Sequence, residues 1–414
     1  MPDGPEEEFR TDVCVVGAGP AGLVLALLLL RSGVRVTVVE RSRTWHREFR
    51  GEILQPGAMA LLDRLGVLAG ARARGCHEHR GFRLVDGDRV LLDIDYRTLA
   101  PPYDHLLSVP QAHVLDELLD RCTRFAGFTL LAGRRVGGLL RAGGRVSGVV
   151  ADGRDGRCRV LAHCVVAADG RFSKVRALAG IGGGRREAFA QDVLWFKLAA
   201  GTAAHGAERN VRIFRAHGSP VLAYDSWPDR VQLGWTLPHG GYRDLAARGI
   251  GHIKEQLARA VPQYAELIDE QVRSPGDLSL LDVFSGRAER WVDDGLVLIG
   301  DAAHTHSPIG AQGINLAVQD AVLLHPLLVA SLDRKDASAA FLADFERRRA
   351  PDIAAVMRLQ GMQSGALLAQ GAFATHVRPA LARLLRHTPA HRAVLTRIAY
   401  GNTSIRISEE CFTP

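Results

Sequence analysis

The chain has 414 residues, of which 47% are hydrophobic and 23% charged, as in folded globular proteins rather than disordered or fibrous ones. Its net charge of +7 could suggest a nucleic-acid partner, but only four of the 52 basic residues are lysines, and the arginines are dispersed along the chain. We therefore predict no nucleic-acid partner, although a mildly positive field would favour an anionic cofactor. This length allows two domains, or one large domain with an insertion.

Cysteine usage and hydropathy bear on the compartment. The six cysteines show neither a CxxC pair nor zinc-type spacing with histidine, which predicts free thiols, no metal site and a cytoplasmic setting. The stretch Val13–Leu30 carries no charge, yet three glycines and Pro20 interrupt it, so we interpret it as buried core rather than a membrane span. The acidic N-terminus also lacks the basic flank of a signal peptide.

The most informative stretch runs from Thr11 to Glu40. A β-branched run leads into GAGPAG at residues 17–22, an apolar helical stretch follows, and a second strand-like run ends at Glu40. This is the dinucleotide-binding fingerprint, with the required strand before it and helix after it. Its glycines allow a tight turn, close approach to a pyrophosphate and close packing of helix on strand, while the helix N-terminus offers N–H groups to phosphates. Glu40 lies 18 residues after Gly22, where a carboxylate can accept hydrogen bonds from the ribose hydroxyls of adenosine.

The spacing of apolar residues predicts strands and helices along the rest of the chain. We expect strands at 128–131, 145–150, 159–162, 165–168 and 296–299, and a hairpin over 82–95 that turns at Asp86-Gly87-Asp88. We expect helices that begin near Pro56 and Gln111, helices over 242–260 and 316–328, and a helical region from 337 onward that is broken at Pro351, Pro379 and Pro389.

Residues 193–236 differ in character, because they hold three of the chain's five tryptophans on short runs separated by Gly and Pro. Apolar and polar residues alternate over 231–236, as in a half-buried antiparallel strand. We predict a second sheet with one face over a substrate pocket; the alternative is that these aromatic residues simply form a second core. The candidate pocket residues on this sheet are Trp195, Lys197, Phe214, Tyr224, Gln232 and Trp235.

Two later segments also end predicted strands with an aspartate and a glycine. One is Asp169-Gly170, and the other is Gly300-Asp301, which leads into a glycine-rich turn over 310–315. A carboxylate at a strand end, such as that of Asp301, can hold a sugar-like hydroxyl. Free N–H groups at the start of the following helix suit a group that gathers negative charge. For the Gly300-Asp301 segment, the alternative is an ordinary strand-to-helix turn with a capping aspartate.

In order and approximate spacing, these three segments resemble the motifs of the class A flavoprotein monooxygenases, the group typified by para-hydroxybenzoate hydroxylase. The resemblance implies an α/β fold: a Rossmann-like FAD-binding domain, an inserted and mainly antiparallel β-sheet substrate domain, and a helical C-terminus. The implied boundaries are 1–190 for the first FAD-binding part (with a substrate-side segment at about 75–110), 191–275 for the substrate domain, 276–335 for the second FAD-binding part and 336–414 for the helical region.

The same resemblance implies which residues hold FAD. Asp301 would contact the ribityl chain, residues 313–315 would meet the isoalloxazine through their backbone, and Pro308 would line the substrate side of the ring. Asp169-Gly170 would lie behind the pyrophosphate, at a place implicated in the use of the nicotinamide cofactor. The expected cofactor-binding residues are Gly17, Gly19, Pro20, Ala21, Gly22, Glu40, Arg41, Arg50, Gln111, Val136, Asp169, Gly170, Asp301, Gly313, Ile314 and Asn315.

The implied activity is hydroxylation of an aromatic small molecule, phenolic or polyketide-like, in secondary metabolism. NADPH or NADH would be the transient reductant and O₂ the oxidant. In this family reduced FAD forms a C4a-hydroperoxide, whose distal oxygen passes to an electron-rich ring carbon, while the protein supplies orientation and a dry pocket. No motif identifies the catalytic base, and we expect His304 to have a packing role or to contact a phosphate rather than to act as the base.

Several alternatives share these motifs. Baeyer–Villiger oxygenation, epoxidation, halogenation and prenyl-chain reduction all occur on related folds, and a non-catalytic flavin-binding protein is the alternative of another class. We expect a monomer or a homodimer.

Overall fold

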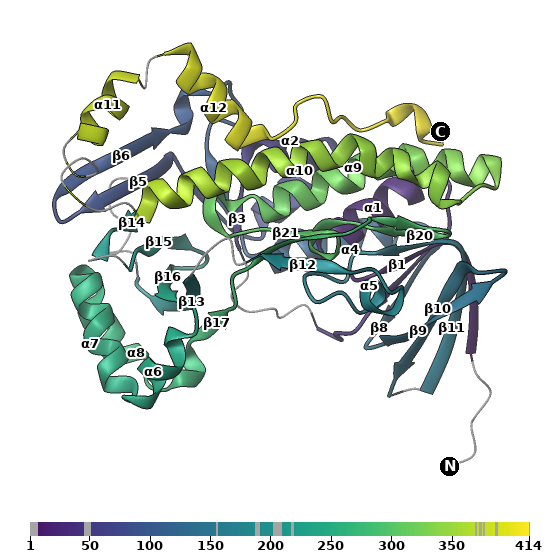
Figure 1. Ribbon diagram of the computed structural model, residues 1–414, viewed down its shortest axis with the longest axis horizontal. Coiled ribbons are helices and arrows are strands. Elements are labelled where there is room, and N and C mark those ends of the chain that lie inside the picture. Colours follow the sequence, from purple (N-terminus) through teal and green to yellow (C-terminus); the bar gives the residue numbers. More distant parts are fainter. Residues whose placement is uncertain are drawn as a thin grey trace.

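The computed structural model describes residues 7–44, 51–154, 156–186, 191–201, 209–216, 219–368, 371, 375, 377–385 and 388–413. Arg50, one of the predicted cofactor-binding residues, lies outside this set. An eight-stranded sheet and a seven-stranded sheet form the two main parts of the molecule. Helix α10 (Ala339–Leu368) runs along both of them, and α9 (Gly313–Arg334) packs beside α10 and α1 (Figure 1).

The eight-stranded sheet contains the fingerprint segment. Its strands follow the order β19-β20-β11-β1-β2-β8, in which β20, β11, β1, β2 and β8 are parallel, and β10 and β9 continue from β11 as an antiparallel pair. The central strands are buried on both faces, which explains their unbroken β-branched runs. This doubly wound sheet confirms the predicted Rossmann-like fold. Its strands are β1 (Glu7–Val16), β2 (Val36–Glu40), β8 (Phe128–Ala132), β9 (Arg135–Ala142), β10 (Arg145–Gly153), β11 (Gly156–Ala167), β19 (Val292–Asp293) and β20 (Leu296–Leu298).

Helix α1 (Pro20–Arg31) is the centre of this domain. It is buried from Ala21 to Leu30 because it packs against α9 and α4 (Gln111–Cys122) as well as against the sheet. A helix covered on all sides is apolar all round, which accounts for the uncharged stretch in the sequence. Among the described residues one helical segment, Ile309–Arg334, is long and apolar enough to cross a membrane, and 61% of its apolar window is buried inside the protein.

The seven-stranded sheet has the order β17-β13-β16-β15-β14-β5-β6 and is antiparallel except where β14 meets β5. One face packs against α7 (Ile250–Ala260) and α8 (Ala265–Gln271), and the other faces the rest of the molecule. The predicted hairpin over 82–95 is present as β5 and β6, and β17 lies beyond the predicted domain end at residue 275. The strands are β5 (Gly81–Asp86), β6 (Arg89–Asp95), β13 (Gln191–Ala199), β14 (Val211–Phe214), β15 (Val221–Ser226), β16 (Arg230–Pro238) and β17 (Ser279–Leu281).

Two three-stranded sheets join these two parts. One has the order β3-β7-β4 and the other β12-β18-β21. Their strands are β3 (Ile53–Leu54), β7 (Leu106–Ser108), β4 (His77–His79), β12 (Gly183–Arg186), β18 (Ser285–Ala288) and β21 (His304–Thr305). The remaining helices are α2 (Pro56–Arg64), α3 (Val67–Ala73), α5 (Lys174–Leu178), α6 (Gly241–Ala247), α11 (Arg378–Leu385) and α12 (Pro389–Tyr400).

The C-terminal region is helical, as predicted, but one expected break is wrong. Helix α10 continues through Pro351, because contacts along α9 hold it together across the missing backbone hydrogen bond. Pro379 and Pro389 do lie in the first turns of α11 and α12, where a missing N–H costs nothing. The helix expected over 242–260 is divided in two at Gly249, whose φ is +85°.

Candidate functional site

The turn after β1 brings two of the three motifs together. Gly17 has a φ of +104°, and its N–H donates to the carbonyl of Val39 at 2.8 Å. A Cβ added to Gly17 would lie 2.5 Å from the carbonyl oxygen of Ala168, which directly precedes Asp169. The fingerprint turn and the Asp169-Gly170 turn are therefore in contact.

Gly19 and Gly22 do different work in this turn. A Cβ on Gly22 would lie 2.0 Å from the carbonyl oxygen of Gly17, so this glycine allows the helix to sit on the strand. A Cβ on Gly19 would meet nothing within 4 Å, and no side chain caps the first turn of α1, which begins at Pro20 and Ala21. An uncapped helix N-terminus behind an open glycine fits a phosphate.

Glu40 lies at the end of β2 and is 1% exposed. Its carboxylate accepts hydrogen bonds from the N–H of Ala18 at 2.8 Å and from the N–H of Ser42 at 2.9 Å. The N–H of Arg134 donates to the Glu40 carbonyl at 3.0 Å, which brings the start of β9 and the buried Val136 close to the predicted adenosine site. Glu40 thus orders the backbone on both sides of that site.

Two more predicted cofactor residues lie at the ends of elements. Arg41 follows β2 and is exposed. Gln111 is half-buried in the first turn of α4, after a proline N-cap and three positions beyond Ser108 of β7.

The carboxylate of Asp169 caps helix α5. It accepts hydrogen bonds from the hydroxyl of Ser173 at 2.5 Å and from the N–H groups of Lys174 and Val175 at 2.8 and 3.1 Å. Burial raises the pKa of Asp169, although these hydrogen bonds oppose the shift. The Asp169 carboxylate is therefore occupied as a helix cap, and its contact with a cofactor stays a prediction. At Gly170, φ is +86° and an added Cβ would meet nothing within 4 Å.

Two arginines connect the Asp169-Gly170 segment to the Gly300-Asp301 segment. The guanidinium of Arg176 donates to the carbonyl of Ala302 at 2.8 Å. Arg171 Nη2 lies 3.8 Å from Asp301 Oδ2, and about a third of the Asp301 side chain is exposed (33%). The partly exposed Asp301 carboxylate fits a ligand hydroxyl at the edge of the sheet.

The starts of α1 and α9 converge at Gly300. This glycine has a φ of +58°, and an added Cβ would lie 3.4 Å from the Cβ of Ala21 and 3.6 Å from the Cβ of Ala317. Helix α9 begins at Gly313 without a side-chain cap, so the backbone N–H groups of its first turn, which includes Ile314 and Asn315, form a second open helix N-terminus.

A buried network behind this turn was not predicted. Asp320, fully buried, accepts from the N–H of Gly300 at 2.8 Å, from His304 Nε2 at 2.6 Å and from Arg349 Nε at 2.7 Å. Burial alone would raise the pKa of Asp320, but the charges of His304 and Arg349 and their hydrogen bonds lower it to about 2. His304 is also buried, in line with the packing role expected from the sequence.

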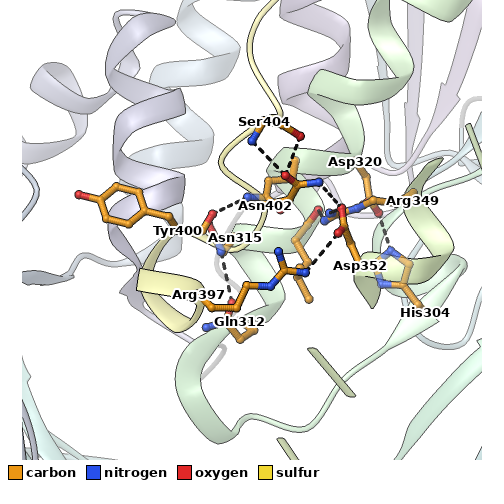
Figure 2. Close-up of polar contacts among 12 residues, drawn as sticks. His304, Gln312, Asn315, Asp320, Arg349, Asp352, Arg397, Tyr400, Asn402 and Ser404 are labelled. Atoms are coloured by element: carbon orange, nitrogen blue, oxygen red, sulfur yellow. Dashed lines mark hydrogen bonds and ion pairs between the residues drawn. The ribbon is translucent and has the colours of Figure 1, made fainter. Parts of the chain in front are cut away.

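The network continues toward the C-terminus (Figure 2). Arg349 Nη1 lies 3.4 Å from Asp352, whose other contacts are Arg397 at 3.2 Å and the amide of Asn402 at 2.6 Å. Asn402 in turn accepts from the hydroxyl of Ser404 at 2.7 Å. This series of contacts ties the C-terminal segment to the Gly300 turn.

Two glutamines hold the turn that precedes α9. The amide of Gln360 donates to the carbonyls of Ser307 and Ile309 at 3.1 and 2.8 Å, which fixes the segment on both sides of Pro308. The amide of Gln55 donates to the carbonyl of Gly310 at 2.6 Å. Single glutamines carry no motif, so neither contact can be predicted from the sequence.

The seven-stranded sheet divides the predicted pocket residues between its two faces. Trp195 and Tyr224 face the turn around Ile309, and Lys197, Gln232 and Tyr224 are cross-strand neighbours on that same face. Phe214 and Trp235 differ from the prediction, because they point to the opposite face and pack against α7 and α8. Side chains alternate between the two faces along a strand, so Gln232 and Trp235 of β16, three positions apart, point to opposite faces. For these two residues the second-core alternative is the correct one.

Together these features fit an extended dinucleotide. One open helix N-terminus suits its phosphates, the partly exposed Asp301 suits its sugar-like chain, and a second open helix N-terminus suits a ring that gathers negative charge. When bound, FAD supplies the oxygen-activating chemistry of such a site.

Comparison with known proteins decides the family. A family model described as an FAD binding domain matches residues 10–360. The chain belongs to the class A flavoprotein monooxygenases. It is 58% identical over 411 residues to 6-methylpretetramide 4-monooxygenase from Streptomyces rimosus, an alignment that covers 99% of this chain and 97% of that protein.

Solved structures show the same fold. The anhydrotetracycline hydroxylase OxyS from Streptomyces rimosus is 26% identical, with a TM-score of 0.73 over 94% of this chain and 76% of that chain. The p-nitrophenol 4-monooxygenase PnpA from Pseudomonas putida superposes with a TM-score of 0.80 over 96% of this monooxygenase and 99% of that chain, at 21% identity. The protein is an FAD-dependent monooxygenase that uses NAD(P)H and O₂ on an aromatic small molecule, as predicted.

Proposed function

We propose that this monooxygenase hydroxylates 6-methylpretetramide, or an aromatic polyketide closely related to it, in secondary metabolism. The observation that carries the proposal is the 58% identity to 6-methylpretetramide 4-monooxygenase along nearly the whole of both chains. The alignment spans both sheets, and so it includes the substrate side as well as the cofactor side.

We also propose roles for the residues of the site. The fingerprint turn and Glu40 would hold the ADP part of FAD, and Val136 would contact the adenine through its backbone. Arg41, Arg50 and Gln111 would contact the flavin. Asp301 would hold the ribityl chain, and the first turn of α9 would meet the isoalloxazine. The open space at Gly19 and the uncapped starts of α1 and α9 support these roles.

The substrate would lie between the isoalloxazine and the seven-stranded sheet. Trp195, Lys197, Tyr224 and Gln232 share the face turned toward Ile309, and Pro308 lies next to that residue. This arrangement supports a pocket with an aromatic wall and a polar end. Phe214 and Trp235 are left out of it, since they pack against helices.

The setting and assembly of the enzyme complete the proposal. It would work in the cytoplasm as a monomer or homodimer, with its six thiols reduced. The structure describes all six cysteines; none of them forms a disulfide, and four are buried.

The test uses purified protein reconstituted with FAD. NADPH and NADH consumption is measured separately, with and without 6-methylpretetramide, and products are examined by mass spectrometry and NMR. The proposal expects stimulated consumption and a product that gains one oxygen atom on its aromatic ring. A protein that binds FAD but leaves this compound unchanged, with no stimulation by either nucleotide, overturns the substrate assignment.

A further inference from the structure

A buried charged pair lies where the seven-stranded sheet meets β3. Lys197 Nζ lies 2.5 Å from Glu52 Oε1, and the hydroxyl of Ser226 donates to Glu52 Oε2 at 2.7 Å. Only 7% of the Glu52 side chain and 13% of the Lys197 side chain are exposed. Burial of two charges is costly, and a fold that only needed packing here would be served as well by apolar side chains.

Buried polar atoms without a hydrogen-bond partner occur on the strands next to this pair. Gln232 is the cross-strand neighbour of both Lys197 and Tyr224, and its Oε1 is buried with no hydrogen-bond partner among the described residues. The hydroxyl of Ser108, which is opposite Ile53 in the β3–β7 pair, is in the same condition. Buried polar atoms of native proteins are normally satisfied, so the unpartnered Gln232 Oε1 beside Lys197 fits a polar ligand at this place.

The pair is also close to the turn assigned to the flavin ring. Gln55, three positions after Glu52, donates to the carbonyl of Gly310 and accepts from the hydroxyl of Tyr96 at 3.0 Å. Ile309 of that turn packs in the same cluster as Trp195 and Tyr224. One short segment thus links the charged pair to the turn in front of α9.

We propose that Glu52 is the general base that accepts the proton of a phenolic hydroxyl on the substrate, and that Lys197 then pairs with the phenolate. The O–H bond of the phenol breaks, an O–H bond forms on the carboxylate, and the electron pair stays on the phenolic oxygen. The ring becomes more electron-rich and no oxidant or reductant is consumed in this step. The proposal rests on the proposed aromatic hydroxylation.

The other groups around the pair do not compete for this role at neutral pH. Burial, and then the charge of Glu52, raises the pKa of Tyr224 well above its usual value, so its hydroxyl stays neutral. Burial lowers the pKa of His79 to about 4, with Asp225 opposing that shift and Arg212 adding to it. Glu52 and Lys197 are the charged groups that reach the face shared with Gln232.

The first measurement needs no turnover. Holoenzyme with FAD is mixed with 6-methylpretetramide in the absence of NAD(P)H, and the absorption of the bound compound is followed against pH, because a polycyclic phenol absorbs at longer wavelength when ionised. We expect Lys197→Met to raise the pH at which the bound phenol ionises. The matched control is Glu78→Gln, which neutralises a glutamate of β4 in a half-exposed pair with Arg72 and leaves the ionisation unchanged.

The second measurement is steady-state kinetics. Glu52→Gln lowers kcat by about 100-fold, the usual worth of a general base, with a much smaller change in KM. The deficit shrinks as the pH rises toward the phenol's own pKa, because ionised substrate no longer needs the base. A merely structural pair would lower thermal stability without this recovery. Wild-type kcat and pH profile in Glu52→Gln, or a deficit that is independent of pH, overturn the proposal.

Folding and substrate identity are checked separately. If Glu52→Gln leaves too little folded protein, the double variant Glu52→Gln/Lys197→Met removes both charges, and its FAD spectrum reports an intact cofactor site. It is expected to show at least the same loss, with the recovery shifted to higher pH because Lys197 no longer pairs with the phenolate. A wild-type enzyme that does not oxygenate 6-methylpretetramide refutes the proposed function, whereas an active wild type with an unaffected Glu52→Gln variant refutes the base alone.

Discussion

Asp320→Asn tests how the Gly300 turn is held. The substitution keeps the shape of the side chain and removes the charge that faces Arg349, and both residues are fully buried. Removal of one partner of a buried ion pair typically costs about 3–5 kcal/mol, because the other charge is left uncompensated. The amide also provides a poorer acceptor for the N–H of Gly300, so the turn beside Asp301 loses its anchor.

Urea unfolding of the apoprotein at neutral pH measures this loss, and fluorescence titration with FAD measures the effect on the cofactor site. The control is Asp344→Asn, because Asp344 pairs with Arg348 at 2.7 Å on the surface and such pairs contribute less than about 1 kcal/mol. The double variant Asp320→Asn/Arg349→Met is expected to recover most of the stability. Stability of Asp320→Asn within about 1 kcal/mol of wild type would refute the role given to the network.

Three further predictions concern the glycines, one histidine and one glutamine. Gly19→Ala is expected to fold with wild-type stability but to bind FAD more weakly. Gly22→Ala is expected to fail to fold, or to unfold at a much lower urea concentration, because its Cβ would lie 2.0 Å from a carbonyl oxygen. Equal stability of the two variants would contradict these separate roles of the two glycines. Burial lowers the pKa of His325 to about 4. As the pH decreases from about 6.5 to 4, the unfolded chain binds a proton at this histidine that the folded chain does not, and the free energy of unfolding therefore falls. His325→Gln is expected to remove about 3 kcal/mol of that fall, seen as a shallower dependence of the urea midpoint on pH, and an unchanged slope would argue against it. Gln360→Leu leaves two carbonyls beside Pro308 without their donor and should raise KM for the substrate more than it weakens FAD binding.

Local sequence patterns were sufficient to predict the fold of the cofactor domain. GAGPAG, the β-branched runs on either side of it and Glu40 lie within a few tens of residues, and each obeys a rule about turns, periodicity or helix ends. The hairpin at residues 82–95 and the helix after the glycine-rich turn were predicted for the same reason. The two strands expected at 159–162 and 165–168 form a single strand, β11. The polar residue His163 lies between the two apolar runs, and for that reason the sequence pattern suggests a break there.

Contacts between residues that are distant in the sequence could not be predicted from local patterns. Asp320, Arg349 and Asn402 share no sequence motif. The packing of α9 against α10 brings Asp320 and Arg349 together, and Asn402 joins them from the C-terminal segment through Asp352. The faces of β14 and β16 were assigned by aromatic content rather than by register, which placed Phe214 and Trp235 on the wrong side. The pairing of Glu52 with Lys197 cannot be predicted from local patterns either, because the two residues come from distant parts of the sequence.

The central claim, that this enzyme inserts one atom of O₂ into an aromatic substrate through bound FAD, is tested most directly by isotope incorporation. The holoenzyme is supplied with NADPH, heavy-isotope O₂ and the substrate proposed above, and the product is analysed by mass spectrometry. The account predicts one heavy oxygen atom in each product molecule, and none without FAD. Oxygen derived from water, or nucleotide oxidation without a labelled product, would contradict it.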